Sequence, residues 1–205
     1  MLVGAAGAIE ALRDEPALAG DNQVRGVVVI AHPHPLFGGT MENKVVQTIA
    51  RAFVQCGWIA LRFNFRGVGQ SAGVHDEGRG ELDDLMAVVR QSAPSGPLAL
   101  AGFSFGSFVA SGAIGALMET RQIERIVLVG TSASRFGANS LPAELHHKTL
   151  VIHGEQDETV PLVDVLDWAR PQNLPVTVVP GASHFFHGQL TLLRGLVARH
   201  LNPGS

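Results

Sequence analysis

Cysteine and charged side chains are both scarce in this sequence of 205 residues. Cys56 is the one cysteine, so the chain can form neither an internal disulfide nor a cysteine-rich zinc site. Charged residues make up 16% of the chain, against about 25% in an average soluble protein, whereas 46% of the residues are hydrophobic. This composition excludes intrinsic disorder, which requires low hydrophobicity together with high charge.

The net charge bears on which partners the protein can bind, and the first residues bear on whether it is secreted. A formal net charge of −3 gives no support for nucleic-acid binding, which usually shows as a strongly basic surface. Residues 1–10 lack the basic start of a secretory signal, and charged side chains precede any long apolar stretch. We expect one domain over residues 1–205, located in the cytoplasm, with no nucleic-acid partner, membrane partner or cofactor.

The longest stretch without an ionisable side chain runs from Gln91 to Met118. A run of this length could be a membrane helix. Its first residues, QSAPSGP, are typical of a turn, and four glycines interrupt the remainder. We therefore divide the run into a turn, a buried strand, a sharp turn and a helix.

Short apolar runs alternate with amphipathic stretches along the rest of the chain. This rhythm predicts strands at 26–31, 58–65, 97–103, 123–129, 150–153 and 176–179, and helices at 42–56, 81–91, 105–118, 161–170 and 189–201. On the 81–91 helix, Leu82 and Leu85 are expected on the buried face, and Glu81, Asp83 and Asp84 mainly on the other. Continuous apolar strands are typical of a sheet buried on both faces. The fold class is therefore α/β, a mostly parallel, doubly wound sheet with helices on both faces.

A G-x-S-x-G pattern lies within the uncharged run, at Gly102–Gly106. The pattern alone is weak, but here it follows a predicted strand and precedes a predicted helix. In that setting Ser104 is expected on a strained turn with its hydroxyl exposed, as in a nucleophile, and the backbone N–H of Phe105 can stabilise an oxyanion. The alternative is that Ser104 only caps the helix.

A serine nucleophile needs a base and an acid, in the chain order serine, acid, histidine. Asp157 and His184 lie in loops that follow two predicted strands, where parallel sheets build their sites. Glu155 could replace Asp157 as the acid, and His187 could replace His184 as the base. We predict Asp157 and His184, because Glu155 should point elsewhere and His187 comes where the last helix begins.

The loop after the first buried strand, residues 31–40, is where hydrolases place a second oxyanion donor. Pro33 and Pro35 have no N–H, so the donor is the main chain of His34 or of Leu36, with His34 preferred. A His-x-His metal pair, His32 with His34, is the rival interpretation, but no further metal-binding pattern accompanies it. A G-x-G-x-x-A match at residues 67–72 is followed by a loop instead of a helix, which argues against a dinucleotide site.

These motifs together resemble those of the small serine α/β-hydrolases related to dienelactone hydrolases. The matching segments are His32–Pro33, Gly38–Val46, Arg62–Ser71, Gly102–Gly106, Gly154–Asp157 and Ser183–His187. The resemblance implies the α/β-hydrolase fold and a catalytic triad of Ser104, Asp157 and His184. Dienelactone hydrolases themselves use a cysteine nucleophile, and this chain has serine at that position.

The expected reaction is hydrolysis of a small carboxylic ester through an acyl-enzyme. Phe37, Phe103 and Phe185 are candidates for the substrate pocket. About 20 residues separate the strands at 123–129 and 150–153, which is too few for a large lid. A thioesterase, an amidase or peptidase, a silent hydrolase-fold binding protein and a metal-dependent hydrolase remain alternatives, and the oligomeric state stays open.

Overall fold

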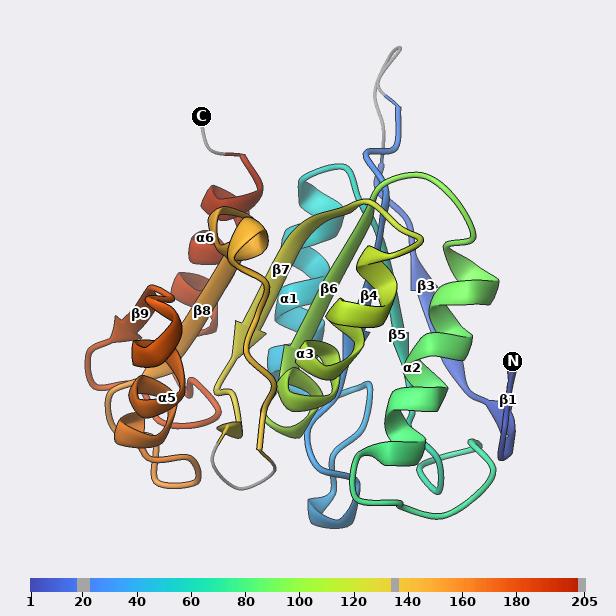
Figure 1. Ribbon diagram of the computed structural model, residues 1–205, viewed down its shortest axis with the longest axis horizontal. Helices are drawn as coiled ribbons and strands as arrows, with labels where there is room; N and C mark the ends of the chain where they lie inside the picture. The colour runs from blue at the N-terminus through green and yellow to red at the C-terminus, as the bar shows by residue number, and fades with distance from the viewer. Residues whose placement is uncertain (18–22, 134–136, 203–205) are drawn as a thin grey trace.

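A computed structural model describes residues 1–17, 23–133 and 137–202, and its centre is a seven-stranded sheet (Figure 1). From one edge to the other, the strands are β3 (Ala11–Asp14), β5 (Ile59–Phe63), β4 (Val27–Ala31), β6 (Leu98–Phe103), β7 (Ile123–Val129), β8 (Thr149–Gly154) and β9 (Val176–Val179). Within this sheet the β3–β5 pair is antiparallel, and the other described pairs are parallel. Strands β4 to β9 therefore end at one edge of the sheet, where such folds build their sites.

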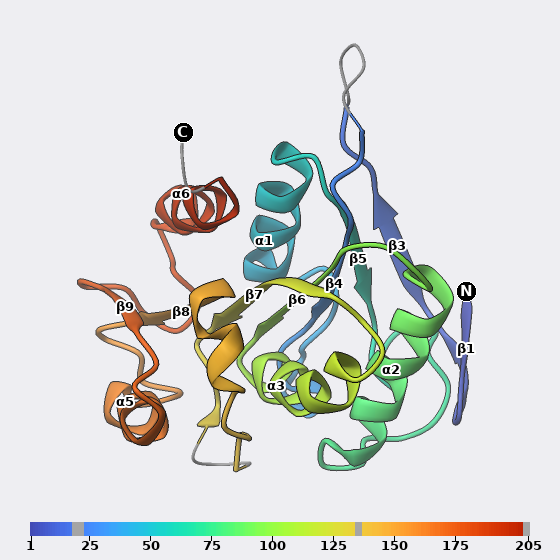
Figure 2. The same ribbon diagram turned by 45° about the horizontal axis from the view of Figure 1, so that its top comes forward.

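Helices cover both faces of this sheet, as Figure 2 shows. Helices α1 (Lys44–Gln55) and α6 (Leu190–Leu201) lie on one face, and α2 (Arg79–Ser92), α3 (Phe105–Met118) and α5 (Leu162–Ala169) on the other. Buried apolar side chains form one cluster on each face, so the central strands are apolar on both sides. The elements predicted from the sequence are present, with bounds that differ by up to two residues.

Three short N-terminal strands were not predicted. Strands β1 (Leu2–Gly4) and β2 (Gly7–Ile9) form a small antiparallel hairpin, and β3 pairs with β5 at the edge of the main sheet. Each has only three or four residues, most of them at least partly exposed, so none produces the continuous apolar run by which the other strands were recognised.

The expectation that the acidic side chains of α2 lie mainly on a solvent face is wrong for two of them. Glu81 and Asp84 are 0% and 1% exposed, whereas Asp83 is exposed. Asp84 is buried because Arg66, on the loop after β5, binds it through both carboxylate oxygens at 2.8 and 3.0 Å. A buried carboxylate is tolerated when it is paired and hydrogen-bonded in this way.

The connection between β7 and β8 is short, as the sequence predicts. Its described residues contain the 3₁₀ helix η2 (Ala143–Lys148) and no inserted domain, and residues 134–136 lie outside the described part. No helix within the described ranges combines the length and the apolar character needed to cross a membrane.

Candidate functional site

Ser104 lies at the sharp turn between β6 and α3, as the G-x-S-x-G pattern predicts. Its φ of 57° and ψ of −117° are strained for a residue with a side chain. The two glycines of the pattern are required by close packing: a Cβ on Gly102 would lie 2.4 Å from the carbonyl oxygen of Gly106, and one on Gly106 would lie 2.3 Å from that of Ala31. The turn thus holds Ser104 above the sheet edge, at the N-terminus of α3.

His184 reaches the same edge of the sheet from the loop after β9. Its ring packs on Phe103, the residue before Ser104, with ring centroids 4.8 Å apart. It also lies beside Gly130, where an added Cβ would be 3.2 Å from Cε1 of the imidazole. The N–H of Ser104 donates to the carbonyl of Val129, the neighbour of Gly130, at 2.8 Å. The imidazole is therefore next to the turn that carries Ser104.

Asp157 is the carboxylate that contacts this imidazole. Its Oδ2 lies 2.6 Å from Nδ1 of His184, and its Oδ1 accepts the N–H groups of Thr159 and Val160 at 2.9 and 2.7 Å. The competing acid, Glu155, is exposed and instead accepts the N–H of Gly181. The two carboxylate oxygens of Asp157 are thus fixed by three contacts.

These contacts also govern the charge of Asp157. Burial alone would raise the pKa of its carboxyl group. The hydrogen bond from His184, the charge of that imidazole and the Val160 N–H outweigh burial and hold the pKa below its ordinary value. Asp157 is therefore ionised at neutral pH and orients His184 so that Nδ1 faces the acid.

A second buried histidine, His153, lies beside the same carboxylate and was not singled out from the sequence. Its Nε2 donates to the carbonyl of Val160 at 2.9 Å and lies 3.5 Å from Oδ2 of Asp157. Burial lowers the pKa of His153, which favours the neutral ring. Its position at the end of a predicted buried strand, four residues before Asp157, was the signal that could have identified it.

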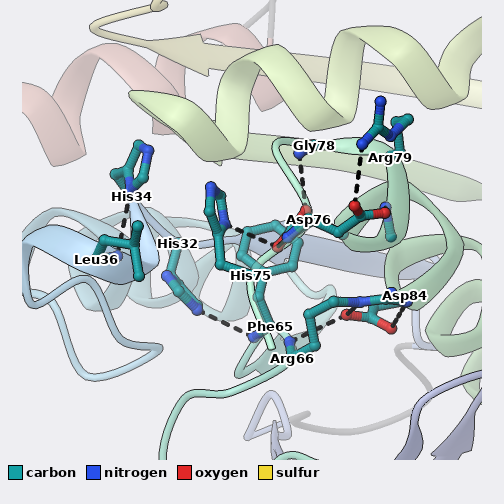
Figure 3. A network of polar contacts seen from close by, with 12 residues as sticks. His32, His34, Leu36, Phe65, Arg66, His75, Asp76, Gly78, Arg79 and Asp84 are labelled. Atoms are coloured by element: carbon teal, nitrogen blue, oxygen red, sulfur yellow. Dashed lines mark hydrogen bonds and ion pairs between the residues drawn. The ribbon is translucent and has the colours of Figure 1, made fainter. Parts of the chain in front are cut away.

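The loop after β4 contacts the other chain neighbour of Ser104, because the ring of His34 packs on that of Phe105 at 4.9 Å. His32 is fully buried: its Nδ1 donates to the carbonyl of Pro33 at 2.6 Å, and its Nε2 accepts the N–H of Phe65 at 3.0 Å (Figure 3). These bonds fix one neutral tautomer. Burial lowers the pKa of His32 to about 4. In the same loop, Nδ1 of His34 accepts the N–H of Leu36 at 3.2 Å (Figure 3).

Another imidazole–carboxylate pair, His75 with Glu81, lies on this side of the site. Nδ1 of His75 is 2.9 Å from Oε1 of Glu81, a close contact without the alignment of a good hydrogen bond. The ring of His75 packs against His34 and Phe105, with centroid distances of 4.8 and 5.6 Å. This pair was not predicted from the sequence, because Glu81 was placed mainly on an outer helix face.

The remaining predicted residues differ in their exposure. Phe103 and Phe105 are fully buried, the first against His184 and the second against His34. Phe37 and Phe185 are 71% and 42% exposed and are accessible to a ligand. The alternative base His187 is exposed, with the ring of Phe185 beside it.

Two findings bear on metal binding. Nδ1 of His32 donates to the Pro33 carbonyl and Nε2 accepts the Phe65 N–H, so the one free lone pair of the neutral ring is already used in a hydrogen bond. Within the ranges that the structure describes, no three histidine, cysteine or acidic side chains are grouped as metal ligands. The His-x-His pattern is accounted for by the two backbone contacts of His32 and by the contact of His34 with the N–H of Leu36.

The sheet, its strand order and the strained serine turn define an α/β-hydrolase fold. The chain belongs to the family described as serine aminopeptidase, S33, whose sequence profile matches residues 22–143. That match includes Ser104 and ends before Asp157 and His184.

Solved structures from two bacteria agree with this assignment. One, from Xanthomonas campestris, is described as an α/β serine hydrolase without a lid; it is 38% identical, with a TM-score of 0.86, covering 98% of this chain and 92% of that one. The other is an α/β serine hydrolase homologue from Coxiella burnetii, 37% identical, with a TM-score of 0.83, covering 98% and 96%. An uncharacterized protein of Rickettsia prowazekii is 31% identical, over 78% of this chain and 71% of its own length.

Proposed function

We propose that this protein is a serine hydrolase that cleaves small carboxylic esters through an acyl-enzyme, with Ser104, His184 and Asp157 as its triad. The observation that carries the proposal is the 2.6 Å contact between Nδ1 of His184 and Oδ2 of Asp157, beside a strained serine. A serine that only caps a helix has no need of a buried imidazole–carboxylate pair next to it. The resemblance of the motifs supports a relationship to the dienelactone-hydrolase-related group.

In the proposed reaction, Nε2 of His184 takes the proton of the Ser104 hydroxyl as the oxygen attacks the ester carbonyl. Asp157 holds the ring and stabilises the imidazolium that forms. The alcohol leaves with the proton from His184, and the acyl group stays on Ser104. Water, deprotonated by the same imidazole, then releases the acid and restores the serine.

The negative charge on the carbonyl oxygen requires N–H donors that are already in place. The N–H of Phe105 lies at the N-terminus of α3, immediately after the nucleophile. For the second donor, the N–H of Leu36 is engaged by Nδ1 of His34, which favours the main chain of His34. Phe37 and Phe185, which are accessible, are the candidates to contact the acyl group, with Phe103 as support below His184.

The substrate class follows from the short connection between β7 and β8. The described residues of this connection include no lid that a lipid surface could open, so we propose that the site acts on short, soluble acyl esters in the cytoplasm. A strong preference for emulsified long-chain esters would contradict this. The family description also names an aminopeptidase, so amide bonds are the alternative substrate.

The decisive experiment combines covalent labelling with substrate turnover. A fluorophosphonate probe should label the wild type and the Ser95→Ala control, in which an exposed serine is removed, but not Ser104→Ala. A panel of p-nitrophenyl acyl esters, a matched thioester and an aminoacyl anilide then identifies the bond that is cleaved. Equal labelling of Ser104→Ala would disprove the assignment of the nucleophile, and faster turnover of the anilide would favour the peptidase.

A further inference from the structure

We infer that His75 is a positioning residue for the oxyanion side of the site, where its imidazole shields the developing negative charge from the buried carboxylate of Glu81. This inference rests on the proposed function, because it concerns the same acyl-transfer step. It adds a second imidazole–carboxylate pair to the machinery, with a role different from that of His184 and Asp157.

The two residues proposed as oxyanion donors share His75 as a neighbour. The rings of His34 and Phe105 pack against each other at 4.9 Å, and each also packs against His75. Figure 3 shows His34 and His75 near each other. A displacement of the His75 ring would therefore disturb the packing of both donor residues, and small displacements of catalytic groups are costly.

Glu81 is held in place by the backbone of the loop before α2. Its Oε1 accepts the N–H of Asp76 at 2.9 Å, and its Oε2 accepts the N–H of Gly78 at 2.8 Å. Gly78 in turn packs closely on α3, because a Cβ there would lie 2.5 Å from the ring of Phe108. The carboxylate is thus fixed close to the first turn of α3, the helix that begins at Phe105.

Glu81 differs from the other acidic side chains of this region in its charge partner. Asp84 pairs with Arg66, and Asp76 pairs with Arg79 (Figure 3). For Glu81, which is 0% exposed, His75 is the one histidine, lysine or arginine side chain in close contact with the carboxylate among the described residues. A buried carboxylate acts over a longer range than an exposed one because water does not screen it.

An unshielded carboxylate near the proposed oxyanion donors would raise the energy of the transition state. The transition state places negative charge on the carbonyl oxygen, near the N–H groups of Phe105 and His34, and a second negative charge nearby raises its energy. His75 contacts Glu81 through Nδ1, and its ring packs on the side chains of both donor residues, so it links the carboxylate to the two residues that supply the N–H groups. The reaction therefore depends on the imidazole at this position and not only on the shape of the ring.

The test is a charge rescue measured on a p-nitrophenyl ester of a short acyl group. His75→Phe keeps an aromatic ring but leaves Glu81 unshielded, so kcat should fall about tenfold or more, with KM changed by less than about twofold. Adding Glu81→Gln should restore kcat to within a few-fold of the wild type. Asp83→Asn is the matched control, because it removes an exposed carboxylate from the same helix and should restore nothing.

If His75 had a purely structural role, the opposite pattern would result: kcat of the double variant would be lower than that of either single variant. The inference is overturned if His75→Phe retains full kcat, if Glu81→Gln fails to restore it, or if Asp83→Asn restores it equally. If His75→Phe does not fold, His75→Gln and His75→Gln/Glu81→Gln make the same comparison. A wild type without ester turnover or probe labelling would instead overturn the proposed function itself, and this inference with it.

Discussion

The ring of Phe103 supports the ring of His184, with centroids 4.8 Å apart and planes inclined at 34°. Phe103 is the residue immediately before Ser104, so the strand that carries the proposed nucleophile also carries the surface on which the proposed base rests. On the other side of the serine, the ring of Phe105 packs against His34 and His75. Each chain neighbour of Ser104 thus positions an imidazole of the site.

Replacing Phe103 by leucine should therefore lower activity more than stability. The loss of a flat ring surface lets the imidazole of His184 move, and we expect kcat to fall about tenfold. The free energy of unfolding should fall by only about 1 kcal/mol. Phe63→Leu, at another fully buried phenylalanine, is the control for packing alone. Similar kcat values for the two variants would contradict a role for Phe103 at His184.

Asp157→Asn should reduce kcat by about 10⁴-fold, because an amide at this position no longer stabilises the imidazolium or fixes its tautomer. Oδ1 of asparagine can still accept the N–H groups of Thr159 and Val160, so the loop should keep its structure. Glu155→Gln is the matched control and should retain most of the activity. The measurement is kcat for both variants together with their urea midpoints. A larger loss in Glu155→Gln would show that the acid is Glu155.

The features that the sequence predicts well are those set by local packing. Gly102 and Gly106 have to be glycine because their neighbours leave no space for a Cβ, and continuous apolar strands must be buried on both faces. The pairing of Asp157 with His184 was inferred from chain order and the ends of parallel strands, and the contact is present at 2.6 Å. Predicting these features requires only the fold class and a recognisable motif.

The features that the sequence did not predict depend on partners distant in the chain. Helical periodicity places Asp84 beside Asp83, and no local pattern shows that Arg66 will bury one of them and leave the other exposed. The same holds for His75 and Glu81, which lie six residues apart across a loop and a helix start. Strand β3 is recognisable only through its pairing with β5.

Asp84→Asn should destabilise the fold, whereas Asp83→Asn should not. Arg66 would lose its ionic partner while its guanidinium remains largely buried, and breaking such a pair costs about 3 kcal/mol. Asp83 is exposed on the same helix, so its neutral variant should lie within about 0.5 kcal/mol of the wild type. Urea denaturation of the three proteins checks both values. Equal stabilities would mean that the Arg66–Asp84 pair contributes nothing net.

Stability should fall as the pH is lowered from about 6.5 towards 4, because His32 must stay neutral in the fold. Its pKa is about 4 in the buried site and about 6.5 when unfolded, so the unfolded chain binds the extra proton within this range. The free energy of unfolding is therefore unaffected above pH 6.5 and falls by about 2 kcal/mol at pH 5 from this residue. His32→Gln, which cannot titrate, should lose that part of the pH dependence. Urea titrations of both proteins at pH 7 and pH 5 measure it, and parallel losses in the two would contradict the assignment to His32.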